Sequence, residues 1–178
     1  MVNWELEILI QAWDPRTDWS NFVKGQTGSG PSIPDTSQIP ILLKTIRDQG
    51  VKYVDMGEDH SVALTHDGGV FSWGQGGHGQ LGHGTISCQN TPRKVFELMG
   101  NRTISLACGR KHTLVLTSTR SVFGFGLNCN NQLGPSHENS IRLPQSQGQF
   151  RGKSYDRIPI SWTAKFSIFS IFTGRYKR

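Results

Sequence analysis

The chain has 178 residues and a formal net charge of +6, and the whole excess of positive charge lies in residues 145–178, which hold seven Lys and Arg residues against one Asp. Residues 1–144 hold twelve cationic and twelve anionic residues and are therefore neutral. A nucleic-acid partner would require basic side chains clustered on the folded region, so this distribution argues against one.

Residues 1–20 carry no signal for secretion. Glu5 and Glu7 stand where a signal peptide has cations, and the apolar stretch beside them is too short for one. The three cysteines are spaced by 20 and 21 residues, which fits neither a C-x-x-C metal cluster nor a disulfide framework. Cys108, in strand-like sequence, reads as a buried thiol. We therefore expect reduced cysteines and a cytoplasmic protein.

Short segments rich in β-branched and aromatic residues then follow in two sets, at 52–56, 61–65 and 70–73, and at 104–108, 113–117 and 121–125. The sequence HDGG at 66–69 predicts a hairpin turn within the first set. Residues 93–98 suit either a fourth short strand or a single helical turn. Three or four short strands in roughly 50 residues are typical of a β-propeller blade, so we predict an all-β fold of antiparallel strands.

The two sets belong to an internal repeat. A shift of 52 residues aligns 57–82 with 109–134 without a gap, with ten identities in 26 positions. Groups that recur once per blade are usually architectural, so we interpret the repeated residues as a structural signature. They are Gly57, His60, Trp73, Gly74, Gln80, Leu81 and Gly82 in the first copy and Gly109, His112, Phe125, Gly126, Gln132, Leu133 and Gly134 in the second.

The repeat also divides the chain. The boundaries we predict are a non-repeat segment at 1–20, a decayed unit at about 21–40 containing KGQTGSG, good units at about 41–92 and 93–144, and a basic non-repeat tail at 145–178. The apolar run in the tail is far short of the roughly 20 residues that cross a bilayer, so we expect no membrane partner.

About two complete blades with flanking partial ones cannot close a ring, so we predict a partial β-propeller that is a fragment or short isoform of a longer protein. We expect the aromatic residues Phe71, Trp73, Phe123 and Phe125 to fill the interface between the two blades. The outer blade faces would be left without neighbours. We therefore expect the isolated chain to aggregate or to melt with weak cooperativity.

One stretch has the spacing of a dinucleotide-binding loop. Gly74, Gly76 and Gly79 form G-x-G-x-x-G, but the second copy has Asn128 and Asn131 in place of the last two glycines. An asparagine side chain would obstruct a pyrophosphate, whereas asparagine readily replaces glycine where φ is positive. No helix pattern follows the loop either. We therefore predict a turn and no cofactor.

Four histidines invite a chemical interpretation. His60 and His112 recur, but no nucleophile or orienting carboxylate recurs beside them, so we expect rings bonded to buried backbone and no catalytic residue. His78 and His83 occur in one copy only and lack further ligands. We expect these two to be solvent-exposed loop residues and predict no metal site.

The combination of G-x-x-H-[ST], a strand, V-F-x-[WF]-G and Q-L-G, present twice in register, resembles the regulator of chromosome condensation repeat. The segments GEDHSVALTHDGGVFSWGQGGHGQLGHGT and TPRKVFELMG look most like the small HERC proteins, in which this propeller precedes a HECT ubiquitin-ligase domain. The resemblance covers about residues 21–144. It implies a seven-bladed propeller that docks protein partners.

From that resemblance we expect a non-enzymatic docking module of a HERC-like ubiquitin ligase, with catalysis in a HECT domain outside this chain. Its partners would be proteins, either ubiquitination substrates or regulators, and the residues that contact them are not predicted. An alternative from the same family is guanine-nucleotide exchange on a small GTPase with chromatin contact. The neutral repeats argue against the chromatin part of that alternative.

Overall fold

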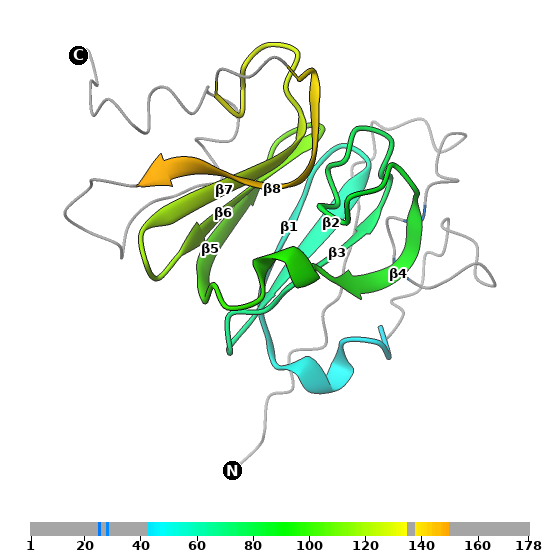
Figure 1. Cartoon of the computed structure of the whole chain (residues 1–178). Helices are drawn as coiled ribbons and strands as arrows, with labels where there is room; N and C mark the ends of the chain where they lie inside the picture. The colour runs from blue at the N-terminus through cyan, green and yellow to red at the C-terminus, as the bar shows by residue number, and fades with distance from the viewer. Residues whose placement is uncertain (1–24, 26–27, 29–42, 135–137, 150–178) are drawn as a thin grey trace, which may run out of the picture.

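The computed structural model describes Gly25, Gly28, residues 43–134 and residues 138–149. Two four-stranded antiparallel sheets stand side by side in it, with strand orders β1-β2-β3-β4 and β5-β6-β7-β8 (Figure 1). The elements are η2 (Arg47–Gln49), β1 (Val51–Met56), β2 (His60–Thr65), β3 (Val70–Gly74), β4 (Gln89–Lys94), η3 (Phe96–Leu98), β5 (Thr103–Cys108), β6 (His112–Thr117), β7 (Ser121–Leu127) and β8 (Ser140–Gln149).

The two sheets repeat each other in register. His60 pairs with Gly74 across β2 and β3, and His112 pairs with Gly126 across β6 and β7. Every residue of β2 and β6 is buried, because these inner strands are packed on both faces. The predicted all-β fold of about two propeller blades is confirmed, and the hairpin predicted at 66–69 is the β2–β3 turn.

Two expectations about strand ends need correction. Residues 93–98 are neither a whole strand nor a whole turn, because β4 begins at Gln89 and ends at Lys94 before the 3-10 turn η3. The boundary expected at residue 144 falls inside β8, which continues to Gln149 and pairs with β7 there. Residues 145–149 read QSQGQ and have no apolar alternation, so their strand depends on pairing with β7.

The core forms two clusters. The larger one lies in and between the blades and contains, among others, Val62, Leu64, Val115 and Phe125. The smaller one contains Phe71 and Trp73 with Leu43, Ile46 and Ala63, on the other face of the first sheet. The two faces separate because successive strand residues point to opposite sides.

The expected aromatic quartet at the interface between the blades is therefore wrong for two of its members. Phe125 and the partly buried Phe123 belong to the larger cluster, whereas Phe71 and Trp73 face away from the second blade. Trp73 is nonetheless a core residue, with no exposed surface. In the described part of the chain, no helix has the length and apolar character needed to cross a membrane.

Candidate functional site at the junction between the blades

The first signature pair, glycine and histidine, builds the turn between the first two strands of each blade. The Gly57 N–H donates to the His60 carbonyl at 2.8 Å, and the Gly109 N–H donates to the His112 carbonyl at 2.8 Å. A side-chain carbon on either glycine would overlap the ring of its histidine. Glycine is therefore required at this position so that the imidazole can fold back into the turn.

His60 links the two blades through a buried hydrogen-bond chain. Its Nε2 lies 3.0 Å from Thr113 Oγ1, and the Thr113 hydroxyl donates to the Gln80 carbonyl at 2.9 Å. Because the single hydroxyl proton goes to Gln80, the His60 Nε2–H must donate to Thr113. We therefore assign His60 as the neutral Nε2–H tautomer. The expected backbone partner for this ring is corrected to a hydroxyl of the next blade.

The surroundings of His60 keep it uncharged. It is 1% exposed, and burial, assisted by the nearby His112, lowers its pKa from 6.5 to about 3. Its Nδ1 has no hydrogen-bond partner among the described residues. A general base needs access to substrate and a pKa near the working pH. His60 has neither, so its geometry is that of a structural link.

The glycines after the aromatic residue let two strands approach closely. Gly74 and Gly126 have φ values of 99° and 113°. The next residue in each blade donates its N–H to the β1–β2 or β5–β6 turn, from Gln75 to the Asp59 carbonyl and from Leu127 to the Lys111 carbonyl, at 2.8 Å in both cases. This contact fixes the start of the loop that carries the Q-L-G signature.

The Q-L-G turn confirms part of the glycine interpretation. Gly79 and its counterpart Asn131 have φ values of 79° and 55°, so asparagine does replace glycine in the left-handed region there. In both copies the glutamine side-chain carbonyl accepts a backbone N–H two residues earlier, at 2.8 Å for Gln80 and 2.9 Å for Gln132. The loop therefore caps its own turn.

The other pair, Gly76 and Asn128, has a different explanation. Gly76 is glycine because a side-chain carbon would overlap the Ser87 carbonyl, and its φ is not in the left-handed region. Asn128 is 2% exposed and uses its amide instead, accepting from the Leu133 N–H at 2.8 Å and donating to the Gly134 carbonyl at 3.1 Å. The expected φ equivalence is wrong here.

His83 also departs from expectation. It is 7% exposed, not a solvent-exposed loop residue, because the loop after β3 folds back and places its Nε2 3.0 Å from Ser72 Oγ. Burial is the main reason that its pKa is lowered. His78 is half-buried. Among residues 43–134 and 138–149, no three His, Cys, Asp or Glu side chains are grouped to hold a metal ion.

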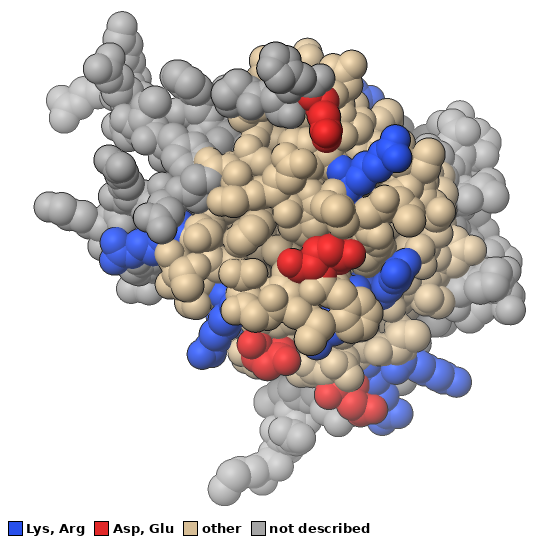
Figure 2. Space-filling view, viewed as in Figure 1, with Lys and Arg blue, Asp and Glu red and all other residues tan. Residues whose placement is uncertain are grey.

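Charged side chains add contacts across the junction. The Asp55 carboxylate accepts from the Cys108 N–H at 2.8 Å, and its burial raises its pKa. Arg110 donates twice to the Glu58 carboxylate, at 2.8 and 2.7 Å. Figure 2 shows acidic and basic side chains interspersed over one face, where neither sign gathers in a continuous patch. The contacts that Asp55 and Glu58 make both join the first blade to the second.

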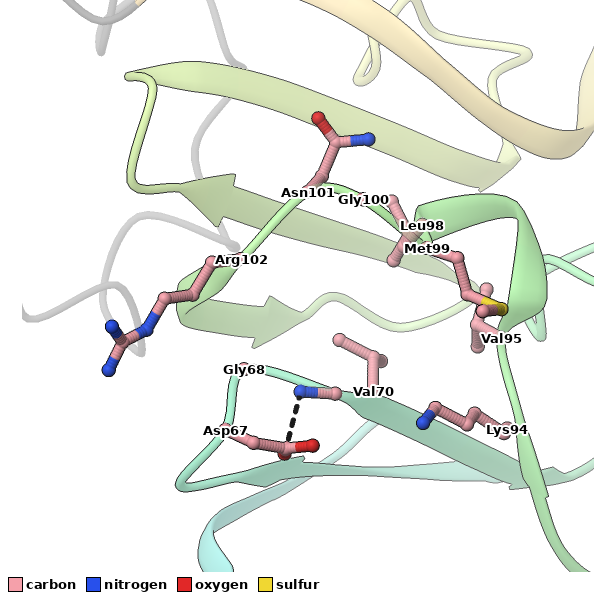
Figure 3. A pocket seen from close by; sticks show the side chains of 11 residues that line it. Asp67, Gly68, Val70, Lys94, Val95, Leu98, Met99, Gly100, Asn101 and Arg102 are labelled. Atoms are coloured by element: carbon pink, nitrogen blue, oxygen red, sulfur yellow. Dashed lines mark hydrogen bonds between the residues drawn. The ribbon is translucent and has the colours of Figure 1, made fainter.

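A pocket opens where the β2–β3 turn of the first blade meets the connection from β4 to β5 (Figure 3). This junction pocket has a volume of about 330 Å³ and is lined by residues that include Val70, Lys94, Val95, Leu98, Met99 and Arg102. Of these residues only Val70 recurs 52 positions later, as Val122, and the other five have no identical counterpart, which is why the repeat pattern does not reveal the pocket. Their signal in the sequence is the apolar segment 95–99 that does not recur 52 residues later.

The sequence matches known repeats over the same region. The regulator of chromosome condensation (RCC1) repeat matches over residues 67–116, and a second form of this repeat matches over 51–80 and 104–132. The region from 51 to 132 that they cover corresponds to the blades from β1 to the second Q-L-G turn.

Several large ubiquitin ligases are similar in sequence. The probable E3 ubiquitin-protein ligase HERC4 of Homo sapiens is 43% identical over 159 residues, which is 88% of this chain and 15% of that protein. The human probable E3 ubiquitin-protein ligase HERC3 is 42% identical over 127 residues, covering 71% of this chain and 12% of that protein. The chain thus spans less than a sixth of the length of these relatives.

Solved structures share the fold. The crystal structure of human WBSCR16 matches with a TM-score of 0.60 at 27% identity, over 72% of this chain and 33% of that one. The Saccharomyces cerevisiae protein Prp20p, whose structure was described with its binding to Gsp1p and histones, matches with a TM-score of 0.61 at 21% identity, over 71% of this chain and 32% of that one.

Proposed function

Because the chain belongs to the regulator of chromosome condensation repeat family, we propose that it is a protein-docking module of a HERC-like ubiquitin ligase and catalyses nothing itself. The observation that carries the proposal is the similarity of most of the chain to a small part of several ligases. The contacts of the signature residues described above support it too, because they stabilise turns and the junction between the blades. The loops at the rim of the propeller would then contact the partner protein. The longer protein that contains this chain would lie in the cytoplasm.

Cys108 supports the non-enzymatic part of the proposal. A ubiquitin thioester requires a reactive thiolate, which is found beside cations or helix N-termini. Burial raises the pKa of the Cys108 thiol well above its ordinary value, and the neighbouring Asp55 adds to this effect. Under the proposal, loading the chain with E1, E2 and ubiquitin gives no reducible adduct, at Cys108 or at the exposed Cys88 and Cys129. An adduct that disappears when a cysteine is replaced by serine would contradict the proposal.

Docking itself can be tested by fusion. The chain is joined to the HECT domain of a similar ligase, and ubiquitinated proteins in cells are compared with those produced by the HECT domain alone. A docking module should change which proteins are ubiquitinated. A matched fusion that carries Thr113→Val, which breaks the hydrogen-bond chain between the blades, should show a smaller change. Identical sets of modified proteins with and without the chain would reject the function.

The second candidate is nucleotide exchange on a small GTPase. What favours it is the structural likeness to Prp20p, the yeast protein described as binding Gsp1p, but 21% identity supports the shared fold alone. The test is release of labelled GDP from a Ran-type GTPase. We expect no acceleration at high concentration of this chain, and a clear acceleration would favour this candidate over docking for ubiquitination.

A further inference from the structure

The junction pocket has an apolar floor. Val70, Val95 and Leu98 form it, and they are 1%, 2% and 4% exposed. Beside it, on the same connection between the blades, Phe96 and Met99 are 57% and 64% exposed, the two largest values among the exposed large hydrophobic residues described. Exposed apolar side chains gathered around an apolar depression are typical of a binding surface.

The walls of the pocket are fixed by backbone hydrogen bonds. The Val95 N–H donates to the Val70 carbonyl at 2.9 Å, and the Asn101 N–H donates to the Leu98 carbonyl at 3.0 Å. The Thr103 N–H donates to the Gly68 carbonyl at 3.1 Å, which ties the second blade to the β2–β3 turn of the first. The pocket is therefore formed before any ligand arrives, which reduces the ordering cost of binding.

The charge available at the pocket is positive. Lys94 and Arg102 stand at its edges (Figure 3), and neither forms an ion pair with a carboxylate in the part of the chain that the structure describes. Asp67, the acidic residue of the lining, accepts hydrogen bonds from the Thr65 hydroxyl and the Gly69 N–H, and these bonds together with the nearby Lys94 lower its pKa, so Asp67 is a carboxylate that attracts Lys94. Asp67 offsets the cations only in part, so an anionic ligand is favoured.

The combination of an apolar floor with two cations at its edges occurs at this junction and is not repeated in the sequence of the next unit. Residues 52 positions later are Ser146 in place of Lys94, Gln147 in place of Val95 and Ser154 in place of Arg102. A feature needed to build every blade would recur, as the histidine and glycine signatures do. This one does not recur, so the repeat architecture does not account for it.

We propose that the junction pocket binds an acidic peptide segment of a partner protein, with one apolar side chain on the floor and carboxylates paired with Lys94 and Arg102. This inference rests on the proposed docking function and names its site and the chemistry of its partner. A volume of about 330 Å³ suits one large side chain, because it lies at the lower end of the roughly 300–1,000 Å³ of ligand pockets. Two cations flanking an apolar floor do not form the row of cations that a nucleic-acid backbone requires.

The probe is a fluorescein-labelled peptide of sequence Glu-Asp-Glu-Leu-Glu-Asp-Glu, titrated with the full chain at roughly physiological salt and followed by fluorescence anisotropy. The double variant Lys94→Glu with Arg102→Glu should weaken binding at least about tenfold. The control, Lys44→Glu with Lys52→Glu, changes the net charge equally at two exposed positions outside the pocket. Because remote charges are screened beyond about 8 Å, it should leave binding nearly unchanged.

A second peptide with glycine in place of leucine should bind about tenfold more weakly if the apolar floor is used. Since a charge reversal at half-buried Lys94 could disturb folding, exposed Arg102→Glu alone provides a further variant, and circular dichroism checks each protein. Absence of binding, equal loss with the control variant, or equal affinity for the glycine peptide would overturn the proposal. Displacement of the peptide by single-stranded DNA at equal concentration would also overturn it.

The outcomes separate this inference from the docking function. If the peptide fails to bind but the HECT fusion still redirects ubiquitination, the docking function stands and the site lies elsewhere. If the peptide binds as expected but the fusion redirects nothing, the pocket is a peptide site and the proposed function is wrong.

Discussion

The ring of Phe125 in the second blade lies directly against the α-carbon of Gly82 in the first. A side-chain carbon at residue 82 would be 2.9 Å from Phe125 Cε2, and Phe125 has no exposed surface. The same contact occurs one unit earlier, where a side-chain carbon on Gly28 would be 2.8 Å from Trp73 Nε1. In each blade the aromatic residue thus packs against the last glycine of the turn in the preceding unit.

Gly82→Ala should therefore destabilise the junction by at least about 2 kcal/mol, because it adds an overlap with Phe125 to the strain of a φ of 72°. The measurement is the urea midpoint followed by intrinsic fluorescence. Gly100→Ala, with a φ of 86° and no atom within 4 Å, isolates the backbone strain. Gly77→Ala meets nothing within 4 Å and has no positive φ. Equal losses for Gly82→Ala and Gly100→Ala would show that the ring contact does not matter.

Because His60 is buried in its neutral form, we expect the free energy of unfolding to fall in acid. Its pKa is about 3 in the folded chain and near 6.5 when unfolded, so protons bind preferentially to the unfolded state as the pH falls through this range. His60→Gln keeps a donor toward Thr113 but does not titrate. We expect its urea midpoint to fall less than that of the natural chain between pH 7 and pH 4.5. His66→Gln, at an exposed turn position, is the control, and an unchanged pH dependence in His60→Gln would contradict the assignment.

Thr113→Val tests the hydrogen-bond chain between the blades. The variant keeps the shape of the side chain but leaves the His60 Nε2–H and the Gln80 carbonyl without their partner. Because Thr113 is 0% exposed, water does not reach the site to replace its hydroxyl. We expect a loss of about 2 kcal/mol in the free energy of unfolding. Thr113→Ser retains the hydroxyl and should lose much less. Equal losses in the two variants would assign the effect to the missing methyl group.

Arg120 is a strained position that can be relieved. It has a φ of 66° at the β6–β7 turn, where the first blade has Gly68 at 90°. Arg120→Gly should raise the free energy of unfolding by about 0.5 kcal/mol, because relief of the left-handed strain exceeds the added entropy of the unfolded chain. Gly68→Ala should do the opposite, since its side-chain carbon would lie 2.6 Å from Arg102 Cγ and 3.0 Å from the Thr103 nitrogen. The measurement is the urea midpoint, which should be higher for Arg120→Gly than for the natural chain.

Much of the fold could be predicted because its causes are local. Turn chemistry at 66–69 and the β-branched and aromatic segments place β1, β2, β3, β5, β6 and β7 to within one or two residues. In contrast, β4 begins four residues before the segment expected for it, and no expected segment corresponds to β8. The 52-residue repeat adds the equivalence of the blades, and the positive φ shared by Gly79 and Asn131 follows from one substitution. The rest of the site could not be predicted from these patterns. Most residues that line the junction pocket do not recur 52 positions later, and only the tertiary structure brings Lys94 and Arg102 to the edges of the same pocket.

The sequence by itself determined where most of the strands and turns lie, because these depend on side-chain shape and backbone φ within a few residues. Only the tertiary structure decided which face of β3 meets the second blade, that His83 is buried against Ser72, and that residues 145–149 extend β8. The physical reason is that burial and pairing are set by partners distant in the chain. The local sequence of an apolar strand does not distinguish its two faces, and the elements packed against the strand decide what covers each face.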